Sequence, residues 1–212
     1  MSGHGPMGAL MRALHRPVYA ARLRTLVSTI GRHLKEGDRV LDVGCGNGTL
    51  GRALMDSPDC PKGVVVEGLE RYKRGGEPIT VHAYDGVKMP MGDGSYDVVI
   101  VADVLHHEED ELRLLRECAR VSRRLVIIKD HVVRGPLAQQ RVSLIDWAAN
   151  APYGVKCLYR YHTPQGWREV RQRLGMDAVE EQLSMNLYPP GVNLLFGRGL
   201  QYLVVLVKAS RQ

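Results

Sequence analysis

The sequence predicts an α/β fold in which helices cover both faces of a mostly parallel β-sheet. Short apolar segments alternate with segments of helical periodicity up to about residue 131, a pattern typical of βαβ units. Residues 95–105 form a nearly continuous apolar run, as expected for a strand that is buried on both faces. The length of 212 residues, with 44% apolar and 25% charged residues, is enough for one domain with a sizeable core.

The N-terminal segment is expected to be helical before the sheet begins. Residues 1–17 lack the apolar core of a signal peptide, so we expect a flexible lead-in with a short helix there. Residues 18–34 have apolar side chains at helical spacing, which predicts a longer helix. We expect this helix to end near Gly37, a suitable C-cap residue.

The next part of the chain is expected to alternate strands and helices. A predicted helix over residues 49–57 is stopped by Pro58, and a second over residues 108–121 has acidic residues in its first turn. The short apolar segments that we expect to form strands are residues 38–43, 62–70, 78–85, 95–105 and 123–132.

The regular pattern loosens after residue 131. Residues 135–152 show helical spacing. Residues 163–175 predict a helix that Thr163 caps, that has Pro164 in its first turn and that ends at Gly175.

Two late strands are expected over residues 176–188 and 200–210. We expect them to pair antiparallel, because only the turn-rich residues 189–199 separate them and we predict no helix between them. No repeat or linker is visible, so we expect a single domain over residues 1–212. Its expected parts are a helical segment (1–37), a ligand-binding core (38–131), a substrate lid with a helix (132–176) and the antiparallel strand pair (177–212).

Composition narrows the functional classes only slightly. Lys and Arg number 29 against 23 Asp and Glu, and this mildly basic balance permits an anionic partner without establishing one. The four cysteines are far apart and form no CxxC pair, so we expect reduced thiols in a cytoplasmic protein. No apolar run approaches the roughly 20 residues of a membrane span.

The most informative stretch is "DVGCGNG", residues 42–48. Glycines at every second position allow backbone N–H groups to approach a ligand closely. The stretch also matches GxGxxG through Gly51, which by itself is weak evidence for a dinucleotide. Asp42 would face a pyrophosphate badly but suits a ligand that carries positive charge. This disfavours a dehydrogenase.

These residues resemble the cofactor loop of the class I S-adenosylmethionine-dependent methyltransferases of the type 11-like group. The resemblance extends over about residues 38–130 and implies a Rossmann-like, seven-stranded sheet with the last two strands antiparallel. It implies S-adenosylmethionine as cofactor, with an acid after the second strand on the ribose hydroxyls and one after the third near the adenine. For the ribose we favour Glu70 over Glu67. The expected cofactor-binding residues are Asp42, Gly44, Cys45, Gly46, Asn47, Glu70, Asp85, Gly86, Ala102 and Asp103.

Two residues of the loop also have other interpretations. Cys45 is interpreted as a small turn residue and not as a nucleophile. Asn47 would either adopt an unusual backbone angle or contact the cofactor.

The candidate catalytic residues are His106, His107 and His131, which follow two predicted strands. A histidine can accept a proton near neutral pH, as methylation of a hydroxyl or amine requires. We expect His106 to face the substrate and His107 to open a helix, as the resemblance implies. Asp146 or a tyrosine of the lid is an alternative base.

A metal site is a further interpretation of the same region. Asp103, His106 and His107 have i, i+3, i+4 spacing, and His131 could join them. The small-RNA 3′-end 2′-O-methyltransferases bind a divalent metal through an acid-x-x-acid-His run and a later histidine. Because His106 stands where they have the second acid, we predict that activity needs no divalent ion.

The predicted lid, residues 144–167, is rich in aromatic residues although the chain has only 2 Trp, 9 Tyr and 1 Phe. Such side chains give contact area to a flat or apolar acceptor, or simply pack the last helix, where Trp167 fits a core position. The aromatic residues of this segment are Trp147, Tyr153, Tyr159, Tyr161 and Trp167.

The favoured function is O- or N-methylation of a small-molecule acceptor. We do not expect a nucleic-acid partner, because no appended RNA-binding module is visible. An RNA or protein methyltransferase, supported by Arg168, Arg171 and Arg173, and a non-enzymatic cofactor-binding protein remain alternatives.

Overall fold

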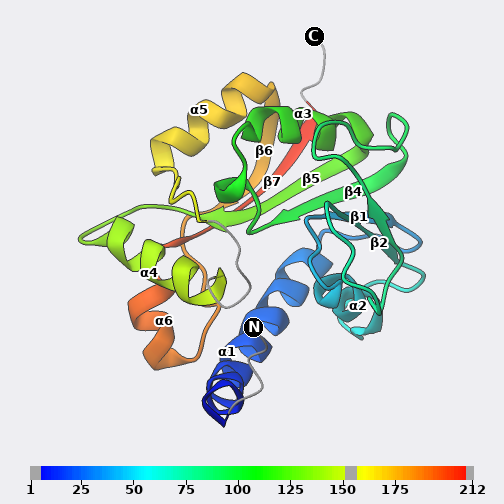
Figure 1. Cartoon of the computed structure of the whole chain (residues 1–212). Helices are drawn as coiled ribbons and strands as arrows, with labels where there is room; N and C mark the ends of the chain where they lie inside the picture. The colour runs from blue at the N-terminus through cyan, green and yellow to red at the C-terminus, as the bar shows by residue number, and fades with distance from the viewer. Residues whose placement is uncertain (1–5, 151–156, 209–212) are drawn as a thin grey trace.

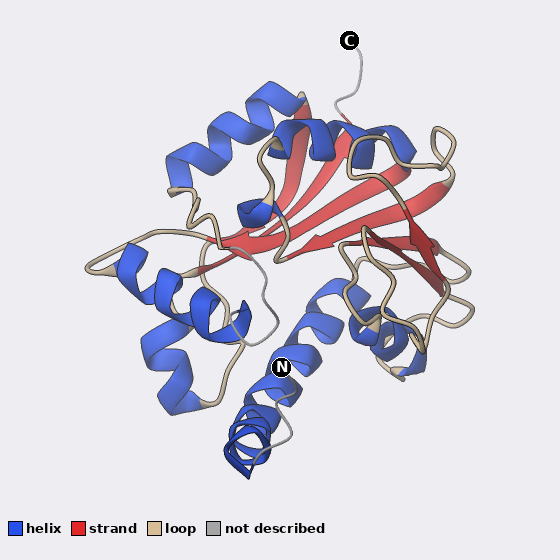
Figure 2. Ribbon diagram, in the orientation of Figure 1, coloured by secondary structure: helices blue, strands red, loops and turns tan. Residues whose placement is uncertain are grey.

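A computed structural model describes residues 6–150 and 157–208 and confirms the predicted fold class (Figures 1 and 2). Seven strands form one sheet in the order β3-β2-β1-β4-β5-β7-β6. Neighbouring strands are parallel except at β7, which is antiparallel to both β5 and β6. The strands are β1 Arg39–Val43, β2 Val65–Glu70, β3 Val81–Ala83, β4 Tyr96–Ala102, β5 Ser122–His131, β6 Met176–Gln182 and β7 Gln201–Lys208.

Helices pack on both faces of the sheet (Figure 2). One face is covered by α3 and α5, which contribute Leu115 and Trp167 to a buried cluster, and the other by α1 and α2, which contribute Ile30 and Leu54 to a second cluster. Helices α4 and α6 contact each other below the end of β5 (Figure 1). The helices are α1 Pro6–Gly31, α2 Thr49–Asp56, the 3₁₀-helix η1 Leu105–His107, α3 Glu111–Val121, α4 Ala138–Asn150, α5 Pro164–Leu174 and α6 Pro190–Phe196.

The boundaries of α5 were predicted correctly. Thr163 caps the helix by accepting a hydrogen bond from the N–H of Gly166 (3.1 Å), and Pro164 is its first residue. Gly175 adopts a left-handed conformation (φ 68°), and its N–H donates to the carbonyls of Arg171 and Gln172. Glycine adopts this conformation without the strain that a Cβ would bring.

The prediction for the N-terminal helix was wrong at both ends. Residues 1–5 of the expected lead-in lie outside the described residues. From Pro6 the chain forms one long helix, α1, in place of a short one, and it runs through Pro17, whose imide removes one helical N–H donor. The helix ends at Gly31, not near Gly37. A Cβ on Gly31 would lie 2.7 Å from the sulfur of Cys60, so the chain turns where it packs closely on the loop after α2.

The prediction that no helix separates the last two strands was also wrong. Residues 190–196 form α6, in which Pro190 is the first residue and the N–H of Asn193 donates to the carbonyl of Pro189 (2.8 Å). The two prolines that suggested a turn mark the start of a helix, because a proline lacks the N–H that the first helical turn leaves unpaired.

Candidate active site

The glycine turn, residues 42–48, connects β1 to α2 where the strand order reverses between β1 and β4. Gly44, Gly46 and Gly48 have φ of 69°, 59° and 74°. A Cβ on Gly44 would lie 2.4 Å from Cγ2 of Val104, and one on Gly48 would lie 2.8 Å from Cγ1 of Ile79. Glycine is therefore required at both positions, and the turn lies at the topological switch point where open α/β sheets bind ligands.

A cavity of about 430 Å³ lies against this turn. The turn and the end of β4 provide the part of its lining that the sequence predicted: Asp42, Gly44, Cys45, Gly46, Asn47 and Ala102. The rest of the lining was not predicted from the sequence and comes from α1 and from the start of α2: Tyr19, Ala20, Arg22, Leu23, Thr49 and Leu50. Arg22 within a helical pattern was the available signal, but nothing in the sequence placed that helix over the turn.

Asp42 is the buried acid of this cavity, with 2% of its surface exposed. Burial, and then the nearby charge of Glu70, raise the pKa of Asp42 to about 7, while Arg22 opposes this shift. A ligand with a positive charge would favour the ionised carboxylate. An ammonium or sulfonium group fits this position better than a phosphate does.

Glu70 lies at the glycine turn, whereas Glu67 does not. The carboxylate of Glu70 accepts hydrogen bonds from the N–H groups of Gly46 (3.0 Å) and Arg71 (2.8 Å). The carboxylate of Glu67 instead contacts Nε2 of His82 (2.6 Å) and accepts from the hydroxyl of Tyr96 (3.0 Å). This geometry agrees with the choice of Glu70 as the acid that would accept ribose hydroxyls, a role that remains a prediction.

Other predicted cofactor residues have structural partners of their own. Asp85 accepts hydrogen bonds from the N–H groups of Val87 (2.7 Å) and Lys88 (3.1 Å). Neither Asp85 nor Gly86 lines the cavity, and a Cβ on Gly86 (φ 80°) would lie 2.6 Å from Nε of Arg71. Their cofactor contacts therefore remain predictions.

The contacts of Asn47 and Cys45 bear on the interpretations of these two turn residues. Asn47 has no positive φ, and its side-chain oxygen accepts from the N–H (3.2 Å) and hydroxyl (2.7 Å) of Thr49 at the start of α2. Burial, and then Asp42, raise the pKa of Cys45 to about 12. A Cβ on Gly68 would lie 2.4 Å from the sulfur of Cys45. Such close packing suits a turn residue and not a nucleophile.

Asp103 connects the cavity to the rest of the site. It has a left-handed backbone (φ 57°), and its carboxylate forms ion pairs with Arg22 of α1 and with the fully buried Lys129 of β5. Burial alone would raise the pKa of Asp103, but the charges of Lys129 and Arg22 hold it well below its usual value. A carboxylate with two cations at the end of β4 thus fixes α1 against the sheet.

His106 is held between two carboxylates. Its Nδ1 lies 2.7 Å from Oδ1 of Asp130, and its Nε2 lies 3.5 Å from Oδ1 of Asp146. Burial opposes protonation, but the charges and hydrogen bonds of Asp130 and Asp146 raise the pKa of His106 to about 10. Asp130 also accepts from the N–H groups of Leu105 (3.0 Å) and His131 (2.7 Å) and so joins the ends of β4 and β5.

His131 differs from His106 in its protonation. Its Nδ1 donates to the carbonyl of Leu200 (3.3 Å), because a carbonyl can only accept, and this leaves the Nε2 lone pair 3.9 Å from Oδ1 of Asp103. Burial, and then the charge of Lys129, lower the pKa of His131 to about 4. His131 is therefore a neutral imidazole near pH 7.

The expected arrangement of His106 and His107 is reversed. The His106 side chain is 3% exposed and that of His107 is 18% exposed, so His107 is the more accessible ring. His107 also does not open a helix. It ends the 3₁₀-helix η1, while α3 begins at Glu111 with Asp110 as its cap. A 3₁₀ turn advances by about three residues, so the pattern expected for an α-helix does not apply.

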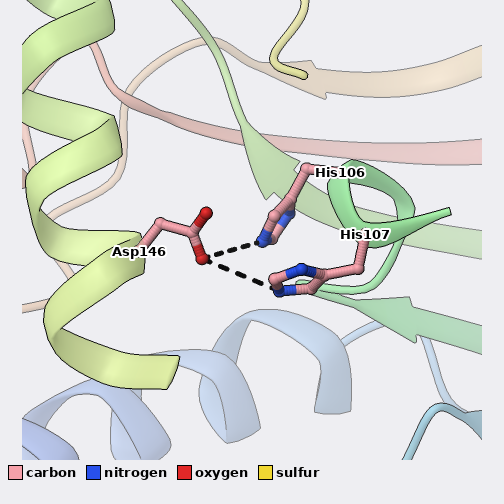
Figure 3. A group of neighbouring side chains, drawn as sticks. All are labelled: His106, His107 and Asp146. Carbon is pink, nitrogen blue, oxygen red and sulfur yellow. Dashed lines mark ion pairs between the residues drawn. The ribbon is translucent and has the colours of Figure 1, made fainter. Parts of the chain in front are cut away.

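Asp146, on α4, faces the rings of both His106 and His107 and completes the group (Figure 3). Its Oδ1 lies 3.7 Å from Nε2 of His107 and 3.5 Å from that of His106, and its Oδ2 accepts from the hydroxyl of Tyr161 (2.6 Å). Despite burial, the bonds from His106 and Tyr161 keep the pKa of Asp146 below its usual value. We call His106, His107 and His131, with Asp130 and Asp146, the histidine cluster.

The possible metal ligands differ from those that the sequence suggested. Within residues 6–150 and 157–208, the group that could hold an ion is His106, His107 and Asp146, whose ligand atoms all lie within 4.8 Å of one another. Asp103 is not in this group, because its carboxylate faces Arg22 and Lys129, and His131 is not in it either.

The predicted lid divides into a packed part and an exposed part. Trp167 stacks on Tyr202 with 4.4 Å between ring centroids, and its Nε1 donates to the carbonyl of His131 (2.9 Å), so it is a core residue. Trp147 and Tyr159 are exposed by 55% and 42%. Tyr153 lies outside the described residues.

None of the helices in the described ranges is both long and apolar enough to cross a membrane.

Comparison with known proteins agrees with this geometry. A family model described as a methyltransferase domain matches residues 41–127. The chain is 33% identical over 103 residues to the 27-O-demethylrifamycin SV methyltransferase of Amycolatopsis mediterranei, covering 42% of this chain and 36% of that protein. It is 35% identical over 95 residues to the ubiquinone biosynthesis O-methyltransferase of Vibrio campbellii, covering 39% and 38%. The matches thus span well under half of the length of these relatives.

Solved structures share the fold. The magnesium protoporphyrin IX methyltransferase of Synechocystis PCC 6803, solved with bound SAH, superposes with a TM-score of 0.59 at 16% identity and covers 92% of this chain and 87% of that one. At this identity the likeness concerns the fold alone.

Proposed function

Because residues 41–127 form a methyltransferase domain of the class I S-adenosylmethionine-dependent type, we propose that the chain methylates an oxygen or nitrogen atom of a small-molecule acceptor. One observation carries the proposal. Asp103 links the lining of the cavity to the histidine cluster, because its carboxylate pairs with Arg22 of that lining and its Oδ1 lies 3.9 Å from Nε2 of His131.

The residues at the glycine turn fit S-adenosylmethionine. Asp42 and Glu70 are acids beside a turn whose glycines leave room for close backbone approach, and a cationic ligand would stabilise the ionised form of the buried Asp42. The cofactor would supply an electrophilic methyl group. The chain would then have to align the acceptor, exclude water and take up a proton.

His131 is the group that we propose as proton acceptor. It is neutral, and its Nδ1–H bond to Leu200 directs the Nε2 lone pair toward Asp103. His106 is less suited to this task, since both of its ring nitrogens face carboxylates and it carries a proton near pH 7. This narrows the original choice among His106, His107 and His131.

The relatives support a small-molecule acceptor, because their names describe a rifamycin and a ubiquinone-pathway O-methyltransferase. Three arginines, Arg168, Arg171 and Arg173, favoured the alternative of an RNA or protein substrate. One of them, Arg171, pairs with Glu181 and donates to the hydroxyl of Tyr202 (2.8 Å) on the face of the sheet that α5 covers, so it gives this alternative less support.

Calorimetry with S-adenosylhomocysteine and NAD tests the cofactor assignment. We expect binding of the first and none of the second, and the opposite result would overturn the proposal. Transfer of label from methyl-labelled S-adenosylmethionine to compounds of a metabolite extract would then identify the acceptor.

Substitution of His131 tests the proposed base. In His131→Gln, turnover should fall by roughly 10²–10⁴, the usual contribution of general base catalysis, while affinity for S-adenosylhomocysteine stays unchanged. His82→Ala is the control, because His82 pairs with Glu67 away from the cavity. Full turnover in His131→Gln would mean that alignment alone, or another group, drives the reaction.

A further inference from the structure

In contrast to the expectation from the sequence that activity needs no divalent ion, we propose that His106, His107 and Asp146 form a binding site for a divalent transition-metal ion of the zinc class. Two imidazoles and one carboxylate are a ligand set that zinc and its neighbours accept, with remaining positions open to other ligands. The three side chains come from η1 and α4 and point toward one another (Figure 3).

The spacing of the ligand atoms suits an ion. Ligand atoms about 2.0–2.2 Å from one tetrahedral ion lie about 3.3–3.6 Å apart. Oδ1 of Asp146 lies 3.5 Å from Nε2 of His106 and 3.7 Å from Nε2 of His107. Both separations lie close to this range, and all three ligand atoms lie within 4.8 Å of one another.

The groups behind the ligands are those that a metal site requires. Asp130 contacts Nδ1 of His106 at 2.7 Å and holds the Nδ1 proton, so Nε2, which faces Asp146, is the nitrogen that would release its proton to bind an ion. The carboxylate of Asp146 accepts from the hydroxyl of Tyr161 (2.6 Å) and from Nδ2 of Asn150 (2.7 Å). Metal-binding histidines usually have such a carboxylate on their second nitrogen, and metal-binding carboxylates are usually hydrogen-bonded in turn.

The charge of the cluster also favours a cation. Asp130 and Asp146 are buried, with 1% and 3% of their surface exposed, and both face His106. The cations Arg22 and Lys129 pair with Asp103 and not with these two acids. The groups nearest these acids are the rings of His106 and His107, and buried charges are normally paired or bound to metal.

The place of the site beside the proposed base indicates that a bound ion would activate the acceptor, an inference that rests on the proposed function. The ring of His106 lies 5.1 Å, centroid to centroid, from that of His131, the proposed base. A hydroxyl oxygen of the acceptor could occupy an open metal position there, and coordination lowers the pKa of a bound hydroxyl or water. The acceptor class would then be a hydroxylated molecule that can ligate the ion through oxygen.

Metal binding can be tested without methyl transfer. Untagged protein is freed of metal, titrated with Co²⁺ while visible absorption is followed, and then challenged with Zn²⁺. We expect one equivalent of Co²⁺ with an absorption band that Zn²⁺ removes. In His107→Ala the affinity should fall at least 10-fold, and in Asp130→Asn it should fall about 10–100-fold, the usual effect of losing a group behind a ligand.

Matched controls keep the result interpretable. His82→Ala should bind Co²⁺ as the unaltered protein does, because His82 pairs with Glu67 elsewhere. Circular dichroism verifies folding, and His107 is the more exposed ligand histidine, so its replacement disturbs the core least. The site is refuted if the folded unaltered protein binds no Co²⁺ at millimolar concentration, or if His107→Ala binds it equally well. Binding of S-adenosylhomocysteine to the same samples separates failure of this site from failure of the proposed function.

Discussion

The glycine turn and the histidine cluster are neighbours at the carboxyl edge of the sheet, but they are built in different ways. The turn is one stretch of seven residues, 42–48, shaped by backbone angles that glycine permits. The cluster consists of side chains from η1, β5 and α4, held by carboxylates that pair across those elements. A contiguous stretch specifies the first site, whereas packing between distant elements specifies the second.

The largest effect should come from removing a carboxylate of the cluster. Asp130→Ala deletes the partner of His106 and leaves the N–H groups of Leu105 and His131 without their acceptor. Breaking a buried pair in this way should lower the free energy of unfolding by about 3–5 kcal/mol. Urea denaturation followed by circular dichroism measures it.

The control for Asp130 is Asp97→Ala. Asp97 pairs with the exposed Arg123 and accepts from the N–H of Arg39 (2.9 Å). Removing the Asp97 carboxylate should lower the free energy of unfolding by about 1 kcal/mol. Equal losses for both variants would show that the cluster does not depend on its buried acids.

The glycine turn should be sensitive to a single methyl group. Gly44→Ala and Gly37→Ala share the cost of a left-handed backbone, with φ of 69° and 74°. Only Gly44 faces Val104, whereas nothing lies within 4 Å of a Cβ on Gly37. We expect Gly44→Ala to lower the free energy of unfolding by about 1–3 kcal/mol more than Gly37→Ala does, which is the usual effect of overpacking a core.

Unfolding of both glycine variants in urea measures this difference, and calorimetry with S-adenosylhomocysteine measures its effect on the cavity. Gly44→Ala should weaken binding and Gly37→Ala should not. If the two variants behave alike, the close approach to Val104 does not constrain the turn.

A smaller effect is expected for the acid beside the turn. Glu70→Ala should weaken binding of S-adenosylhomocysteine by about 1–3 kcal/mol, the scale for losing hydrogen bonds to a charged group. Glu67→Ala should leave the affinity unchanged, because that carboxylate faces His82 and Tyr96. Calorimetry on both variants decides between the two acids, and unchanged affinity in Glu70→Ala would show that the assignment is wrong.

The smallest effect concerns a histidine outside the cluster. Nε2 of His162 lies 2.7 Å from Oε2 of Glu111, and this hydrogen bond raises the pKa of His162 although partial burial opposes the shift. When the pKa of a histidine is higher in the folded state than in the unfolded state, protonation stabilises the fold. This stabilisation is fully present at pH values below the unfolded-state pKa of about 6.5. This contribution is lost as the pH rises through the folded-state pKa.

Comparison of His162→Gln with the unaltered protein at pH 5.5 and pH 9 tests this point. The difference in unfolding free energy should be about 0.5–1 kcal/mol larger at the lower pH, as for other partly exposed ion pairs. A difference that is larger at pH 9 would mean that Glu111 does not stabilise the protonated ring.

The correctly predicted features share a local physical origin. The caps of α5 at Thr163 and Gly175 follow from hydrogen bonds within the helix itself. The strands of the parallel sheet follow from apolar runs, as in β4. Two of the incorrect predictions involve contacts with distant residues or another helix type: α1 turns where Gly31 meets Cys60, and η1 is a 3₁₀-helix. The missed helix α6 has a local cause instead, because Pro190 starts it.

The sequence by itself determined the fold class and the glycine turn, because periodicity and the φ angles open to glycine are properties of a short segment. Only the tertiary structure decided that α1 covers the cavity, that His106 is buried while His107 is more exposed, and that Asp146 meets both rings. Asp146 lies on a different element from the histidines, and its meeting with them depends on how α4 packs against the end of the sheet. Spacing along the chain carries no information about that packing, because long-range contacts, not local periodicity, fix the orientation of a side chain in the core.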